Sequence, residues 1–106
     1  MNEFYYLDIS LKLAAEPDQL LPVYFKSCLE QALVRIFGEI GGQTTVDLLK
    51  FDTKQARAIV RVPSNIYVKL RSAIALIGQF QDIPCSFVVH KAGPLLLALV
   101  ETHLEF

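Results

Sequence analysis

Two arginines in one short stretch are the residues of this sequence best suited to bind a charged partner. In QARAIVRV, residues 55–62, small apolar residues alternate with Arg57, Ile59 and Arg61. This alternation is typical of a β-strand with one buried face, so both arginines are expected on the opposite face. A guanidinium group pairs with phosphate or with carboxylate. The stretch predicts ionic contact with RNA phosphates or with a protein partner, and two solvated arginines are an equally weighted alternative.

Lysines extend this set of candidate ionic contacts, which then comprises Lys50, Lys54, Arg57, Arg61 and Lys91. The net charge of −1 and the pI near 6.1 do not fit a protein that coats nucleic acid by charge alone. RNA-recognition modules stack bases on aromatic residues of their third strand, whereas residues 55–62 contain no aromatic side chain. The sequence therefore predicts local ionic contact without base stacking.

Side chains that could carry catalysis are present but form no recognisable pattern. His90 and His103 have no serine or cysteine at a spacing that suggests a nucleophile and its base. Gly41 and Gly42 follow a predicted helix instead of preceding one, so they indicate a turn and not a phosphate-binding loop. The carboxylates are scattered, and the two cysteines occupy positions where an apolar side chain would serve. We therefore expect no catalytic residues, no metal site and no cofactor.

The elements that position these residues follow from the hydrophobic periodicity. The predicted strands cover residues 5–13, 46–51, 55–62 and 85–92, and the predicted helices run from Pro22 to just before Gly38 and from Ser64 to just before Gly78. The order β-α-β-β-α-β predicts one α+β domain over residues 1–106, with a ferredoxin-like or RRM-like antiparallel sheet, both helices on one face and the other face open. The segment LLLALVETHL adds a short C-terminal helix or a strand.

Apolar residues are more abundant than a small core needs, at 53% of the chain with a mean hydropathy of +0.39. A partner that covers one flank would account for the surplus, and a very well packed monomer is the alternative. The expected interface comprises positions outside the inner stripe of the second helix and the leucines after Pro94: Val68, Ala75, Leu76, Leu95, Leu96 and Leu97. The longest aliphatic run is too short for a membrane helix, and MNEFYYLD lacks the blocks of a secretory signal, so we expect an intracellular protein without membrane contact.

Three segments resemble a known family when they are taken together. They are FGEIG at residues 37–41, KFDTKQARAIVRVPSNIYVKLRSAIALIGQF at 50–80 and CSFVVHKAGPLLLAL at 85–99. The first two resemble the small protein subunits shared by ribonuclease P and ribonuclease MRP in eukaryotes and archaea, and the third is most similar to the eukaryotic fourteen-kilodalton member. In place of the basic turn of the better-known branch, residues 92–97 read AGPLLL, which favours docking onto protein at this segment.

The resemblance implies a non-catalytic subunit of a ribonucleoprotein that removes the 5′ leader from precursor tRNA, with the catalytic metals held by RNA. It further implies two protein partners, a paralogous small subunit and a thirty-kilodalton TIM-barrel-like subunit, together with ribonuclease P RNA and precursor tRNA. The implied location is the nucleus and nucleolus.

A different class of function fits the same element order. A ferredoxin-like regulatory or dimerisation module that binds a small ligand would also show no active site. Such a module needs a cleft with convergent polar groups, for which the GGQTT loop at residues 41–45 is the candidate.

Overall fold

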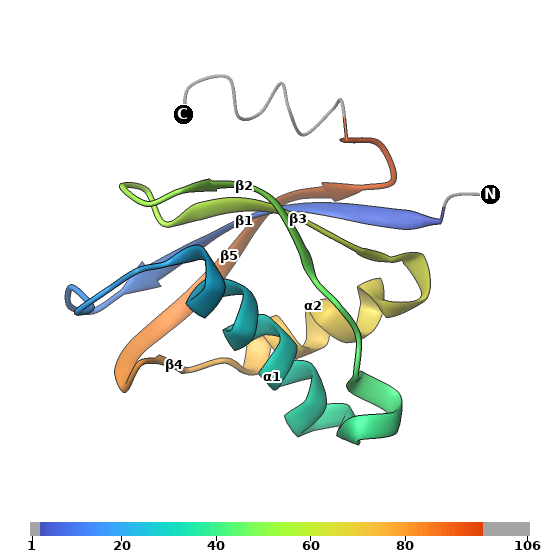
Figure 1. Ribbon diagram of the computed structural model, residues 1–106, viewed down its shortest axis with the longest axis horizontal. Coiled ribbons are helices and arrows are strands. Elements are labelled where there is room, and N and C mark those ends of the chain that lie inside the picture. The colour runs from blue at the N-terminus through green and yellow to red at the C-terminus, as the bar shows by residue number, and fades with distance from the viewer. Residues whose placement is uncertain (1–2, 97–106) are drawn as a thin grey trace.

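The computed structural model describes residues 3–96. Its elements in chain order are β1 (Phe4–Leu13), α1 (Pro22–Gly42), β2 (Asp47–Asp52), β3 (Arg57–Pro63), the 3-10 helix η1 (Ser64–Ile66), α2 (Tyr67–Leu76), β4 (Gln79–Phe80) and β5 (Ile83–Gly93). The strands form one sheet in the order β2-β3-β1-β5-β4, with every neighbouring pair antiparallel. Both helices cover the same face of this sheet (Figure 1). The predicted α+β class is confirmed.

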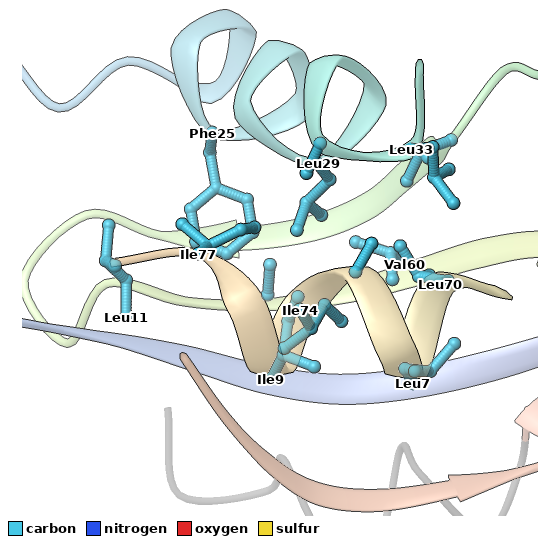
Figure 2. Packing of buried hydrophobic residues seen from close by; sticks show 14 of the residues in the cluster. Leu7, Ile9, Leu11, Phe25, Leu29, Leu33, Val60, Leu70, Ile74 and Ile77 are labelled. Carbon is cyan, nitrogen blue, oxygen red and sulfur yellow. The ribbon is translucent and has the colours of Figure 1, made fainter. Parts of the chain in front are cut away.

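The core lies between the helices and this face of the sheet. Every second residue of β1 points inward, and α1 and α2 contribute residues at three- and four-residue spacing, as Figure 2 shows. The completely or almost completely buried side chains include Leu7, Ile9, Leu11, Phe25, Leu29, Leu33, Val60, Leu70 and Ile74. The inward alternation in residues 55–62 is confirmed for Ala58, Val60 and Val62, which are fully buried.

The last part of the sheet differs from the sequence prediction by one short hairpin. β5 begins at Ile83 and is preceded by β4, a two-residue strand that pairs Gln79 with Pro84 and Phe80 with Ile83. The two turn residues, Gln81 and Asp82, have φ of 51° and 64°. Left-handed residues at both central positions match the twist of a two-residue hairpin, and because the usual Asn-Gly signal is missing here, the sequence did not indicate a hairpin.

The first helix ends later than its glycine signal predicts. Gly38 has φ 77° and ψ 173°, which kinks the helix, and the chain then makes a further helical turn to Gly42. The ammonium group of Lys69 on α2 donates to the carbonyl oxygen of Gly41 at 2.7 Å. A cation is favourable beside the unpaired carbonyl groups at the end of a helix. Gly41 and Gly42, predicted as a turn, therefore belong to the last turn of α1.

The outer face of the sheet, opposite the helices and predicted to be open, is buried in part. Asp8 and Ile59 are 0% and 2% exposed and Ser10 is 8% exposed, although all three side chains point away from the helical layer. Arg57 bonds to Asp8 and His90 bonds to Ser10, so long side chains lie over the shorter ones. Ile59, expected as an exposed aliphatic spot, is thus a buried residue outside the main core.

Some predictions fall on residues that lie outside the described range. These are the C-terminal helix or strand beyond residue 96, Leu97 as an interface residue, and His103. Within residues 3–96, none of the helices combines the length and apolar character needed to cross a bilayer.

Candidate interaction surfaces

A two-pronged ionic contact on the outer sheet face joins Arg57 on β3 to Asp8 on β1. Nε of Arg57 donates to Oδ1 of Asp8 at 2.9 Å, and Nη2 donates to Oδ2 at 2.6 Å. The Asp8 side chain is 0% exposed and that of Arg57 is 19% exposed. Two parallel charge-assisted hydrogen bonds satisfy a carboxylate that water cannot reach. Arg57, one of the two arginines predicted to contact a partner, is therefore bound to an aspartate of its own chain.

The second arginine has a weaker internal partner. Nε of Arg61 donates to Oδ2 of Asp47 on β2 at 3.0 Å, and its guanidinium carbon lies 4.7 Å from the centroid of the Phe4 ring. The Arg61 and Asp47 side chains are equally half-exposed. An ion pair in contact with water contributes little free energy, so Arg61 can exchange Asp47 for another anion at small cost.

The predicted lysines lie around this pair of arginines. Cross-strand pairing places Lys50 opposite Ile59 and Lys91 opposite Asp8, so both belong to the outer face. Lys54 lies in the β2–β3 turn, where its backbone N–H donates to Asp52 at 2.9 Å. All three lysines are exposed. The sheet thus brings Lys50, Arg57, Arg61 and Lys91 to one face and leaves Lys54 at its end, while contact of any of them with RNA or a partner stays a prediction.

A hydrogen bond between Ser10 and His90 was missed by the sequence analysis. Oγ of Ser10 and Nε2 of His90 are 2.8 Å apart, although the residues are separated by 80 positions in the chain. A β-bulge between Asp8 and Ile9 shifts the β1–β5 register at this point, which strict alternation cannot predict. Ser10 is buried, and within residues 3–96 no carboxylate bonds to His90. The pair lacks the orienting group and the access that a nucleophile needs.

The predicted interface residues occupy two surfaces. On the outer side of α2, Val68 and Leu76 are 72% and 71% exposed, and Ala75 is exposed between them. Leu95 and Leu96, also exposed, follow β5, where the chain rises on the side of the sheet away from the helices (Figure 1). Because one surface lies on the helical side of the sheet and the other on the opposite side, a partner bound to one side alone cannot cover both.

A groove of about 480 Å³ lies between α1 and the connection from α2 to β5. Its α1 wall carries Tyr24, Ser27, Gln31 and Arg35, which share one face of the helix. The GGQTT loop, the sequence candidate for a ligand cleft, does not line it. This groove was not predicted from the sequence, and the available signal was the run of polar residues at positions i, i+3, i+7 and i+11 of a predicted amphipathic helix.

Cys28 lies in the wall of this groove. The pKa of its thiol is raised to about 11, mainly by burial and in smaller part by the neighbouring Cys85, while Arg35 acts in the opposite direction. Burial also raises the pKa of Cys85. Since the thiolate is the reactive form, both cysteines are protonated and unreactive near neutral pH. No group of three or more His, Cys, Asp or Glu side chains suited to a metal ion occurs in the described part of the chain.

The rate of Cys28 alkylation is therefore expected to rise with pH in proportion to the thiolate fraction of a group with a pKa of about 11. The rate with iodoacetamide should rise about tenfold per pH unit from pH 8 to pH 10, whereas a free thiol with a pKa of about 8.5 levels off near pH 9. Peptide mapping by mass spectrometry separates Cys28 from Cys85. A profile for Cys28 that levels off by pH 9 would contradict the burial seen in the structure.

Comparison with known proteins identifies the family. A family described as "Ribonucleases P/MRP protein subunit Pop8" matches residues 3–76. The chain belongs to this ribonuclease P/MRP subunit family. The mouse (Mus musculus) protein "Ribonuclease P protein subunit p14" is 37% identical over 98 residues, which are 92% of this chain and 80% of the mouse protein. Its human (Homo sapiens) namesake is 33% identical over the same length. The resemblance drawn from the residues is thus confirmed.

A solved structure supports the fold of this ribonuclease P/MRP subunit. A chain in the "Cryo-EM structure of yeast Ribonuclease MRP" aligns with a TM-score of 0.70 at 18% identity, covering 99% of this chain and 92% of that chain. At such low identity the similarity establishes a common fold. It does not transfer the contacts of the yeast chain.

Proposed function

We propose that this chain is a non-catalytic subunit of the ribonuclease P holoenzyme, and of ribonuclease MRP, that supports removal of the 5′ leader from precursor tRNA. The observation that carries the proposal is the family match, which extends over three of the four long strands and both helices. The surface chemistry agrees with an accessory role. In the one Ser–His pair found in residues 3–96, the serine is buried and the histidine lacks an orienting carboxylate.

Assembly would use the apolar surfaces, and RNA contact would use the ionic one. Val68 and Leu76 form an exposed apolar ridge on α2, of the kind that a protein partner covers. The proposed partners are a paralogous small subunit and a thirty-kilodalton TIM-barrel-like subunit. On the outer sheet face, Lys50, Arg61 and Lys91 would contribute local contact with phosphates of the ribonuclease P RNA or precursor tRNA. The proposed location is the nucleus and nucleolus, where such a holoenzyme would act.

The test is affinity purification of the tagged chain from cells, followed by sequencing of bound RNA and assay of 5′-leader cleavage. Changing Val68 and Leu76 together to aspartate is expected to lower recovery of ribonuclease P RNA and cleavage activity at least about tenfold, because a charge would be desolvated in the interface. Val23→Asp is the matched control, since Val23 is an exposed aliphatic residue at the start of α1.

Two results would contradict the proposal. Unchanged RNA recovery in the double variant would show that the outer side of α2 is not part of the interface. Cleavage of precursor tRNA by the purified chain free of RNA would show that the subunit is itself a nuclease.

A further inference from the structure

The groove between α1 and the β4–β5 hairpin differs from the outer sheet face, because its polar side chains have no hydrogen-bond or ion-pair partners among residues 3–96. Arg57 and Arg61 both pair with aspartates of the same chain, and Lys69 bonds to a backbone carbonyl. In contrast, within residues 3–96 the Arg35 guanidinium makes no hydrogen bond or ion pair, and neither do the side chains of Gln31 and Gln79, which line the same groove. The groove therefore offers unsatisfied donors and acceptors.

The backbone of β4 adds an edge to this groove. The carbonyl of Pro84 accepts from the N–H of Ala14 at 3.0 Å, so the backbone groups of Pro84 face the β1 side. Gln79 is the cross-strand partner of Pro84. In an antiparallel pair of strands, the backbone N–H and C=O groups of two partner residues either point toward each other or both point away. Since the C=O of Pro84 points away from β4, the N–H and C=O of Gln79 point away from β5. β4 is the last strand of the sheet, which leaves these two groups at its edge.

An extended polypeptide segment is the ligand that fits such an edge. One residue of the segment, placed opposite Gln79, would donate its N–H to the Gln79 carbonyl and accept from the Gln79 N–H. Tyr24 borders the groove, is 41% exposed and provides apolar contact for a side chain of the segment. RNA fits less well, since its sugar–phosphate backbone has no regularly placed N–H donor for the carbonyl.

Charge determines which kind of segment is preferred. Arg35 lies on the α1 wall, close enough to Cys28 to lower the pKa of its thiol. Asp82 also lines the groove, but from the hairpin turn at one side. An acidic side chain directed at α1 would form a charge-assisted pair with Arg35, which is exposed in the free chain.

We infer that this groove is a docking site for an extended acidic segment of a partner polypeptide, which adds as a short strand to the edge at Gln79 and pairs a carboxylate with Arg35. This goes beyond the proposed function, which uses the outer side of α2 and the outer sheet face. It can be tested without any other ribonuclease component, so the two proposals fail independently.

The experiment uses the purified chain and three labelled heptapeptides in fluorescence anisotropy. The first alternates threonine and valine around a central glutamate, the second has lysine in place of the glutamate, and the third carries N-methyl groups on alternate amides of the first. We expect the glutamate peptide to bind at least about tenfold more tightly than either of the other two. In ¹H–¹⁵N spectra the Gln79 amide should shift and become protected from exchange.

Variants on the same helix separate the charge effect from loss of folding. Arg35→Glu should abolish the preference for glutamate and favour the lysine peptide. Lys26→Glu makes the same change in charge on α1 outside the groove and should leave the preference intact. Circular dichroism shows whether each variant is folded.

Four outcomes would overturn the inference. Three of them concern the peptides: absence of binding by the glutamate peptide at millimolar concentration, binding that depends on neither N-methylation nor Arg35, and spectral shifts confined to the outer sheet face. Self-association of the chain that Arg35→Glu removes would also overturn it, because it would make a second copy the occupant.

Discussion

Replacing Arg57 with alanine is expected to lower the free energy of unfolding by about 3–5 kcal/mol, because it removes two charge-assisted hydrogen bonds from a buried carboxylate. Asp8 is 0% exposed, and Arg57 supplies two charge-assisted hydrogen bonds to it. Water cannot replace them without opening the sheet between β1 and β3. Urea denaturation followed by circular dichroism measures the loss as a lower midpoint at an unchanged slope.

Arg61 provides the matched control on the same strand. Its pair with Asp47 is half-exposed on both sides, so Arg61→Ala should cost no more than about 1 kcal/mol. A double change of Asp8 to asparagine and Arg57 to methionine removes both charges and should be less destabilising than Arg57→Ala alone, since no uncompensated charge is left. Equal costs for Arg57→Ala and Arg61→Ala would show that Asp8 reaches water.

The difference in expected stability cost between Arg57→Ala and Arg61→Ala affects how RNA contact on the outer sheet face should be tested. A variant that replaces both arginines loses stability through Arg57, and weaker RNA binding would then report partial unfolding. Arg61→Ala with Lys50→Ala changes charge on the same face at exposed or half-exposed positions. If these residues meet phosphates, the pair of changes should weaken binding about equally for all RNA sequences and lower the salt slope by roughly two units.

Periodicity predicted the parts of the fold in which burial alone decides the structure. The alternation in β1 was read correctly, and Leu7, Ile9 and Leu11 are buried. Of the stripe predicted for the second helix, Leu70, Ala73, Ile74 and Ile77 are buried. Ile66, predicted as its first residue, lies half-buried in the 3-10 helix η1, before α2 begins. The same reasoning placed Val68 and Leu76 on the exposed side of α2. A residue's face follows from its own segment, so no knowledge of distant contacts is needed.

Predictions failed where a structural feature depends on two distant segments. The partner of Arg57 is 49 positions away on β1, and the polar alternation of β1 gave no reason to expect Asp8 to be buried. The groove forms only when α1 meets the β4–β5 hairpin, and the hairpin turn contains Gln81 and Asp82, which differ from the usual Asn-Gly pair at left-handed positions. The site therefore required the tertiary structure, although the family could be recognised from the sequence.

The end of α1 shows the same limit and leads to a second large expected effect. Gly42 was read as part of a turn, but it is buried against the helix that precedes it. A Cβ atom at Gly42 would lie 2.2 Å from the carbonyl oxygen of Leu33 and 2.6 Å from its carbonyl carbon. Both are backbone atoms of α1, so no side chain can rotate to relieve the contact.

Gly42→Ala is therefore expected to lower the free energy of unfolding by about 3 kcal/mol, at the upper end of the usual cost of overpacking. Gly41→Ala is the control, since its Cβ would lie 3.7 Å from Nζ of Lys69 and from Cβ of Phe37, which is ordinary contact. It should change stability by less than about 0.5 kcal/mol. The unfolding midpoints of both variants are measured in urea. Equal midpoints would contradict the close approach of Gly42 to the backbone of Leu33.

The structural consequence of Gly42→Ala should spread along the chain that follows, because the clash would push the last turn of α1 away from Leu33. Beyond that turn, the backbone N–H of Val46 donates to Oε2 of Glu30 on α1 at 2.8 Å, which fixes the entry into β2. Displacing this segment would lengthen that bond and loosen β2, an edge strand of the sheet. In ¹H–¹⁵N spectra of Gly42→Ala, the Val46 amide should therefore shift, whereas the amide of Leu7, on the central strand β1, should stay near its original position. Equal shifts at both amides would mean that the substitution disturbs the whole sheet and not the entry into β2.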